Sequence, residues 1–292
     1  MSIDFSSVEK IIKVAESEGV AISDVILRQS SVDTKTSQEE ILAKMMHNLE
    51  VMQASINEGL TPGIRSLSGL TNDEAHLLKA HVESGKSLSG KLMGQAVYGS
   101  MAVMSTNACM GRIVAAPTAG SSGIIPGCLL AMLAHLDVDK NQLVRGLLNA
   151  SGIGMVIAKN ASISGAVGGC QAECGSASAM AASAMVEIMG GTPQMCGHAI
   201  SLALKSLMGL VCDPVAGLVE EPCVTRNAAS TSVAIISADM ALAGIKSIIP
   251  VDEVIVAMGE VGKALPESLR ETALGGLAAT PTARKLEKEI FG

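Results

Sequence analysis

The sequence predicts an all-α fold in which glycine-rich loops connect the helices. No segment alternates apolar and polar residues with the β-branched enrichment that is typical of strands. Several segments instead repeat apolar residues every three or four positions between helix-capping residues. The apolar side chains are mostly aliphatic, since the 292 residues include 17 Met and 30 Gly but only one Tyr, two Phe and no Trp. A chain this apolar and this weakly charged does not have the composition of a disordered protein.

Capping boxes mark three helices in the N-terminal part of the chain. Each box places Ser or Thr three residues before Glu, and a Gly follows the end of each helix. The three predicted helices cover residues 6–19, 37–59 and 71–85. We therefore divide the chain into an N-terminal helical segment, residues 1–36, and a larger helical domain, residues 37–292.

Helical periodicity continues through the rest of the chain. The helix that begins at Pro193 is clearly bounded, with Thr192 as its N-cap and Gly209 after its end. Charged side chains are scarce between residues 92 and 212, where we count nine, against 40 in the remainder. We expect this stretch to be deeply buried or covered by another subunit. The predicted helices in this part cover residues 124–136, 139–150, 176–189, 193–208, 226–243, 252–265 and 282–291.

Charge, hydropathy and cysteine content exclude several classes of protein. The net charge of -7 and the lack of aromatic rings argue against binding to nucleic acid. The mean hydropathy is +0.42, but Pro and Gly break the longest uncharged run, residues 113–136, which argues against a membrane protein. Met1–Asp4 has neither the basic nor the apolar region of a signal peptide. Seven cysteines without a secretion signal favour the reducing cytoplasm.

Four loops of unusual composition separate the helices. The first, residues 115–123, places Gly, Pro and Ser before a helix, so its backbone N–H groups suit a phosphate or a carboxylate. An ordinary turn would have the same composition. The second, residues 159–175, contains Lys159, which fits either a Schiff-base lysine or a structural cation. The other two loops cover residues 209–227 and 275–282.

The cysteines fall into two groups. Three lie in the loops beside Gly or Pro, namely Cys170, Cys212 and Cys223. Three others lie in apolar helical surroundings, where Cys is usually a small buried hydrophobe, namely Cys109, Cys128 and Cys196. Only Cys170 and Cys174 are close in sequence, so neither the paired spacing of zinc sites nor the ferredoxin spacing is present. Spacing alone leaves both a metal site and a set of buried thiols open.

Together, the four loops resemble those of the iron–sulfur-dependent bacterial L-serine dehydratases, specifically the alpha chain of the two-chain type. The similarity extends from about residue 40 to the end, which makes residues 37–292 the catalytic helical domain. The resemblance implies a helical fold and a 4Fe–4S cluster that is held by Cys170, Cys212 and Cys223. The matching segments are APTAGSSGIIPG, KNASISGAVGGCQAECGSASAMAA, GLVCDPVAGLVEEPCVTRNA and GGLAATPT.

The implied reaction is the dehydration and deamination of L-serine to pyruvate and ammonia. Three thiolates leave one iron of the cluster without a protein ligand, and that iron acts as a Lewis acid on the departing β-hydroxyl. A base, which the sequence does not identify, removes the Cα proton. The aminoacrylate that results rearranges and hydrolyses to pyruvate and ammonia.

The resemblance also directs attention to polar residues of the loops. Five are candidates for binding the substrate carboxylate or for a wall beside the cluster, namely Thr118, Gly120, Ser121, Ser122 and Gly123. Four are candidates for orienting the substrate, namely Lys159, Asn160, Ser162 and Ser164. Two beside Cys223 are candidates for supporting the cluster site, namely Arg226 and Asn227.

Two departures from the single-chain members of the family point to a partner. Those members begin with a regulatory half and end in a tail whose terminal Cys reaches the open iron. This chain lacks that half and ends at Lys288–Gly292 without a Cys. We therefore expect a serine dehydratase beta chain to supply the missing half, whose Ser- and His-rich residues are candidates for the base.

Three other functions are compatible with the same residues. The nearest is a cysteine desulfidase-type lyase on the same scaffold, which a panel of substrates would separate. A pyridoxal-phosphate dehydratase with Lys159 as the Schiff base would show a different absorption spectrum. A non-catalytic helical partner with buried cysteines would contain no iron.

Overall fold

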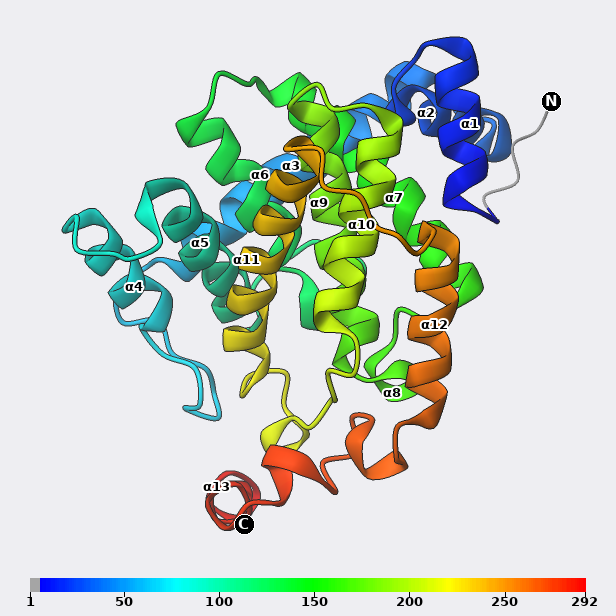
Figure 1. Ribbon diagram of the computed structural model, residues 1–292. Coiled ribbons are helices and arrows are strands. Elements are labelled where there is room, and N and C mark those ends of the chain that lie inside the picture. Colours follow the sequence, from blue (N-terminus) through cyan, green and yellow to red (C-terminus); the bar gives the residue numbers. More distant parts are fainter. Residues whose placement is uncertain (1–5) are drawn as a thin grey trace.

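The computed structural model describes residues 6–292, and within them every regular element is a helix (Figure 1). The one strand-like pairing in this part of the chain is an isolated bridge between Cys212 and Arg270. The all-α prediction is therefore confirmed. Met1–Asp4, where we looked for a signal peptide, lies outside the described residues. Among residues 6–292, none of the helices has the length and apolar character needed to span a membrane.

The helices form a bundle, and short turns lie between several of them. The π-helical turn η2 (Gln171–Gly175) and the 3₁₀ turns η1 (Ala119–Ser121), η3 (Val215–Gly217), η4 (Glu267–Leu269) and η5 (Gly276–Ala279) all lie in loop regions. The α-helices of the described residues are α1 (Val8–Glu18), α2 (Ile22–Thr34), α3 (Gln38–Gly59), α4 (Glu74–Glu83), α5 (Gly90–Ala108), α6 (Ile124–His135), α7 (Lys140–Asn160), α8 (Gly165–Gly168), α9 (Ser176–Ile188), α10 (Pro193–Leu207), α11 (Cys223–Leu242), α12 (Val251–Ala264) and α13 (Pro281–Phe291).

Helix α9 lies in the middle of the bundle and packs against α6, α7, α10 and α11 (Figure 1). Most of its residues are Ala or Ser, and all from Ser176 to Val186 are buried. Small side chains on every side let four neighbouring helices approach it closely. For this helix, the shortage of charge in the middle of the chain therefore reflects burial within the chain itself.

The first N-cap lies one residue later than predicted. Ser7, not Ser6, caps α1, because its hydroxyl accepts a hydrogen bond from the Lys10 N–H at 3.2 Å. The Asp252 carboxylate of α12 explains the difference, because it accepts one hydrogen bond from the Ser7 hydroxyl at 2.6 Å and another from the Val8 N–H at 2.8 Å. The tertiary contact fixes where the helix begins.

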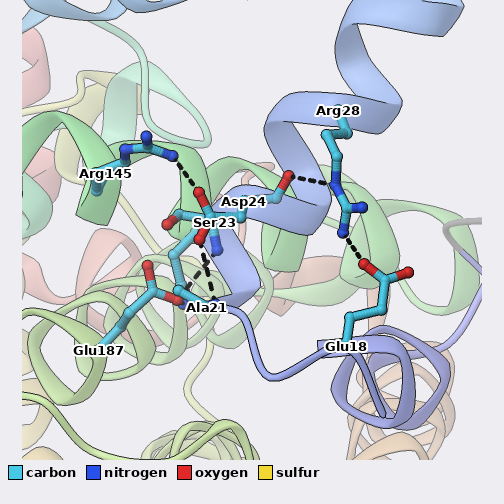
Figure 2. Close-up of polar contacts among 8 residues, drawn as sticks. Glu18, Ala21, Ser23, Asp24, Arg28, Arg145 and Glu187 are labelled. Atoms are coloured by element: carbon cyan, nitrogen blue, oxygen red, sulfur yellow. Dashed lines mark hydrogen bonds and ion pairs between the residues drawn. The ribbon is translucent and has the colours of Figure 1, made fainter. Parts of the chain in front are cut away.

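Polar contacts also attach α2 to the bundle (Figure 2). Asp24 accepts from the Arg145 guanidinium of α7 at 2.6 Å, and Glu187 of α9 accepts from the Ser23 N–H at 3.1 Å. Burial raises the pKa of the Glu187 carboxyl, although hydrogen bonds from Ser23 and Asn149 counteract part of the rise. The N-terminal helices are thus held to the larger bundle by charged groups as well as by apolar packing.

The predicted helix over residues 37–59 is present with its predicted cap, but the next two regions differ. Ser37 caps α3 by accepting from the Glu40 N–H. Thr71 does not cap α4, which begins after Asp73, because the Thr71 carbonyl accepts from the Ser66 N–H in a turn. Helix α5 has no predicted counterpart, because apolar and small residues cover all its faces and leave no amphipathic period.

Two helices are longer than predicted, and both changes affect the candidate site. Helix α7 continues from Ala150 to Asn160 through two glycines that are contact points rather than breaks. A Cβ on Gly152 would lie 2.3 Å from Ile26 Cδ1, and one on Gly154 would lie 2.9 Å from Met180 Cε. Helix α11 begins at Cys223 instead of residue 226. Lys159, Asn160 and Cys223 are therefore helical, whereas the sequence placed them in loops.

Candidate functional site

The glycine-rich loops meet at one end of the bundle, near α8 and the first turn of α11 (Figure 1). Turn η1 of the first loop contacts both η2 and α11. Turn η3 contacts η5 and the C-terminal helix α13. The first loop and α11, whose contacting residues lie up to 107 positions apart in the sequence, are thus packed together.

Asn227, which is fully buried on α11, ties the first loop to this end of the bundle. Its amide donates to the Gly120 carbonyl at 2.7 Å and to the Cys223 carbonyl at 2.9 Å. Its Oδ1 accepts from the Gly123 N–H at 3.2 Å. One side chain therefore fixes both ends of the turn that contains the predicted carboxylate-binding residues.

The structure brings Cys170, Cys212 and Cys223 together from three different segments. Their exposed fractions are 3%, 4% and 9%, so all three thiols are buried. Burial raises the pKa of Cys212, and the nearby charges of Cys170, Glu173, Glu271 and Cys223 raise it further. Cys212 is thus close enough to the other two thiols for their charges to affect its pKa.

Backbone hydrogen bonds hold Cys212 from both sides. Its N–H donates to the Leu269 carbonyl at 2.9 Å, and its carbonyl accepts from the Glu271 N–H at 2.7 Å. The flanking residues are held by Arg226 of α11, which donates to the Val211 carbonyl at 2.8 Å and pairs with Asp213 at 2.7 Å. Because Arg226 lies one turn after Cys223, it fixes the Cys212 loop relative to the helix that carries the third cysteine.

Cys170 has a fourth cysteine beside it. The Cys174 sulfur lies 3.3 Å from the Cys170 sulfur, and the two thiols share a hydrogen bond. This hydrogen bond lowers the pKa of Cys170, against the opposing effect of burial. Gln171, between them, donates to the Met258 carbonyl and accepts from the Gly209 N–H, which joins the π turn to α12 and to the Cys212 loop. Cys170 is thus the thiol of this group that is predisposed to ionise.

Glu173 was not among the residues selected from the sequence, yet it lies at the centre of the site. Its side chain is 9% exposed, and its Oε1 accepts from the Thr118 hydroxyl at 2.7 Å. Burial raises the pKa of the Glu173 carboxyl, the Thr118 hydrogen bond lowers it, and the charge of Glu271 raises it. The sequence feature that could have identified Glu173 as a site residue is that it is a single acidic residue within a segment of small residues.

Residues of the first loop make two kinds of contact: some face Glu173, and the others hold the loop in place. Thr118 and Gly120 face Glu173, since a Cβ on Gly120 would lie 2.9 Å from its Oε1. Ser121 and Ser122 are buried, and the Ser122 hydroxyl donates to the Ala119 carbonyl. A Cβ on Gly123 would lie 2.2 Å from the Ser100 carbonyl oxygen, so Gly123 is a contact between the loop and α5. The N–H groups of Ser122 and Gly123 already have protein partners.

The four residues expected to orient a substrate lie at the end of α7 and in the turn before α8. Lys159 and Asn160 are exposed in the last turn of α7, and the Asn160 amide donates to the Ser6 and Val156 carbonyls. Ser162 accepts from the Ser164 N–H at 3.1 Å in the turn that precedes α8. Of these, Ser162 and Ser164 shape the segment that leads to Cys170, whereas Asn160 faces the N-terminal segment.

The donor set does not match a site for a single metal ion. Within residues 6–292, no three His, Cys, Asp or Glu side chains are close enough to bind one ion.

Comparisons with known proteins identify close relatives. The model of a family described as serine dehydratase alpha chain matches residues 17–278. A Bacillus subtilis (strain 168) protein named "Probable L-serine dehydratase, alpha chain" is 53% identical over 288 residues, which cover 99% of this chain and 96% of that protein. The "L-serine dehydratase, alpha chain" of Peptoniphilus asaccharolyticus is 45% identical over 98% of both chains. "L-serine dehydratase TdcG" of Escherichia coli (strain K12) is 37% identical over 94% of this chain but only 62% of its own length.

Proposed function

Because the chain belongs to the serine dehydratase alpha chain family, we propose that it is the alpha chain of an L-serine ammonia-lyase. The reaction removes the Cα proton and the β-hydroxyl of L-serine to give 2-aminoacrylate and water. Hydrolysis of the tautomer of 2-aminoacrylate then releases pyruvate and ammonia. The observation that carries the proposal is the group of three buried cysteines that three distant segments bring together beside Glu173 and Thr118.

The residues at this site fit an iron–sulfur cluster. Thiolates are the preferred ligands of such clusters, and Cys170, Cys212 and Cys223 would each bind a different iron. The three thiols are buried, and the charges of Cys170 and Cys223 both act on the pKa of Cys212, so the three lie near one another. When it is bound through three cysteines, a 4Fe–4S cluster supplies an open iron that acts as a Lewis acid toward the leaving hydroxyl.

The protein's own residues position the thiols and the substrate. Arg226 and Asn227 hold the Cys212 loop and the first loop against the start of α11. Burial of the site under the glycine-rich loops excludes water from the reacting groups, which strengthens every charge interaction there. Thr118 and Glu173 present a hydroxyl and a carboxylate between the first loop and the cysteines.

A beta chain completes the enzyme in this proposal. The chain covers 96–98% of the two alpha chains compared above but only 62% of TdcG. The part of TdcG that has no counterpart here corresponds to the proposed beta chain. The seven cysteines are free thiols, so we also place the protein in a reducing compartment, the cytoplasm.

The test is pyruvate formation by anaerobically purified alpha chain, alone and mixed with the beta chain. We expect L-serine to give equal amounts of pyruvate and ammonia, and the beta chain to increase the rate. L-Cysteine is the control substrate for the desulfidase alternative. Sulfide release from L-cysteine that is faster than pyruvate release from L-serine would overturn the proposal.

A further inference from the structure

The Glu173 carboxylate lies between the first loop and the cysteines, where a substrate would be enclosed. We propose that Glu173 binds the α-ammonium group of the amino-acid substrate, a role that rests on the dehydratase function proposed above. Three observations support this role: the convergence of side chains on Glu173, the sign of the charges around it, and the hydrogen bond that orients it.

Glycines allow the carboxylate to approach the cysteine group. A Cβ on Gly165 would lie 2.7 Å from Glu173 Oε2, 3.0 Å from Cys212 Sγ and 3.1 Å from Glu271 Oε2. The three side-chain atoms therefore converge beside the same backbone position. A Cβ on Gly120 would lie 2.9 Å from the other oxygen, Oε1. A Cβ at Gly120 or Gly165 would press on a carboxylate oxygen, so both glycines leave room for the carboxylate where it lies.

The charges around Glu173 favour a cationic ligand group. The neighbouring charge that acts on its carboxyl is another carboxylate, Glu271, which is exposed at the edge of the site. The cation that acts on Cys170 and Cys223, Arg226, is paired with Asp213 at 2.7 Å. The potential at Glu173 is therefore negative, and it attracts the ammonium end of a zwitterion rather than its carboxylate.

The orientation of the carboxylate matches this role. Thr118 donates to Oε1 at 2.7 Å and lies 3.1 Å from the Ser121 hydroxyl, so one oxygen is fixed to the first loop. The other, Oε2, faces the side of Cys212 and Glu271. L-Serine carries its ammonium and its β-hydroxyl on adjacent carbons. A carboxylate that holds the ammonium therefore also determines which way the hydroxyl points, and this favours α-amino acids over α-hydroxy acids.

The experiment compares two unreactive ligands that differ only at the α-substituent. L-Alanine has the ammonium, L-lactate has a hydroxyl in its place, and neither has the β-hydroxyl that the reaction removes. Their dissociation constants are measured by calorimetry under argon, for the complex of alpha and beta chains. Wild type is compared with Glu173→Gln, which keeps the size of the side chain and an acceptor for Thr118.

The matched control is Glu187→Gln, the same change at another buried carboxyl, which lies in the last turn of α9 and contacts α2 (Figure 2). Iron and sulfide content are measured for each variant. We expect Glu173→Gln to weaken L-alanine binding by about 10- to 100-fold, the size of a hydrogen bond to a charged group, and to leave L-lactate binding nearly unchanged. The KM for L-serine should rise in parallel, and Glu187→Gln should change neither ligand.

Equal weakening of both ligands would indicate a structural role for Glu173 and overturn the inference, as would unchanged L-alanine binding. If Glu173→Gln lost its iron, Thr118→Val would serve as the second variant, because it removes the orienting hydroxyl and leaves the carboxylate in place. The same selective loss of L-alanine binding is expected there, by a smaller factor. A wild-type complex that formed no pyruvate from L-serine would instead refute the proposed function.

Discussion

Asn227→Ala should destabilise the chain more than its small change in volume suggests. The substitution removes the bonds from Asn227 to the Gly120 carbonyl and the Gly123 N–H, which are at 2.7 Å and 3.2 Å. The Cys223 carbonyl is less affected, because its helical partner remains. A part-buried carbonyl and a buried N–H lose their partner, at a cost of about 1–3 kcal/mol each, so the total loss of unfolding free energy is about 2–6 kcal/mol.

Asn160→Ala is the matched control for this prediction. Asn160 also donates two hydrogen bonds to carbonyls, but it is exposed, and a surface change of this kind costs less than about 0.5 kcal/mol. The assay is urea unfolding under argon, followed by circular dichroism, for both variants and wild type. Bound iron is measured on the same samples. If Asn227→Ala lost no more stability than Asn160→Ala, the claim that this side chain joins the loop to α11 would be wrong.

Two further predictions test the packing and the electrostatics of the bundle. Gly165→Ala should lower bound iron and activity at least about tenfold, because its Cβ would lie 2.7 Å from Glu173 Oε2 and 3.0 Å from Cys212 Sγ. Gly175→Ala, whose Cβ would meet ordinary contacts of 3.8 Å, should not, and iron analysis of both variants distinguishes a local clash from a general effect of added methyl groups. Burial raises the pKa of Glu187 above 4.5, so the folded state holds this proton more tightly than the unfolded state, and stability falls as pH rises from 4.5 through the raised pKa. Unfolding experiments should therefore show Glu187→Gln gaining stability relative to wild type between pH 4 and pH 7, and a constant difference would contradict this reasoning.

The parts of the fold that the sequence predicted are those with local signals. Ser37 and Thr192 cap helices where expected, because capping depends on a few adjacent residues. Helix α5 carries no such signal, since its surroundings bury all of its faces. Gly152 and Gly154 lie just past the predicted end of the helix over residues 139–150, but they are contact points with Ile26 and Met180, which only the tertiary structure shows.

The same limit applies to the candidate site. Cys170, Cys212 and Cys223 could be selected because the loop motifs resemble a known family, and the structure brings them together. Glu173 and Gln171 depend on which turns pack against which, so no spacing in the sequence could reveal them. Asn160 was selected from the same motif as Cys170, but the extension of α7 directs its amide to Ser6.

Analysis of iron and acid-labile sulfide in single Cys→Ala variants tests whether three cysteines hold an iron–sulfur cluster. After anaerobic purification, the Ala variants of Cys170, Cys212 and Cys223 should lose the cluster. The Ala variants of the helix residues Cys128 and Cys196 should keep it and lose only about 1 kcal/mol of stability. Cys174→Ala should also keep its iron, although Cys174 lies 3.3 Å from Cys170. Full iron and sulfide content in Cys212→Ala would show that Cys212 is not a ligand of the cluster.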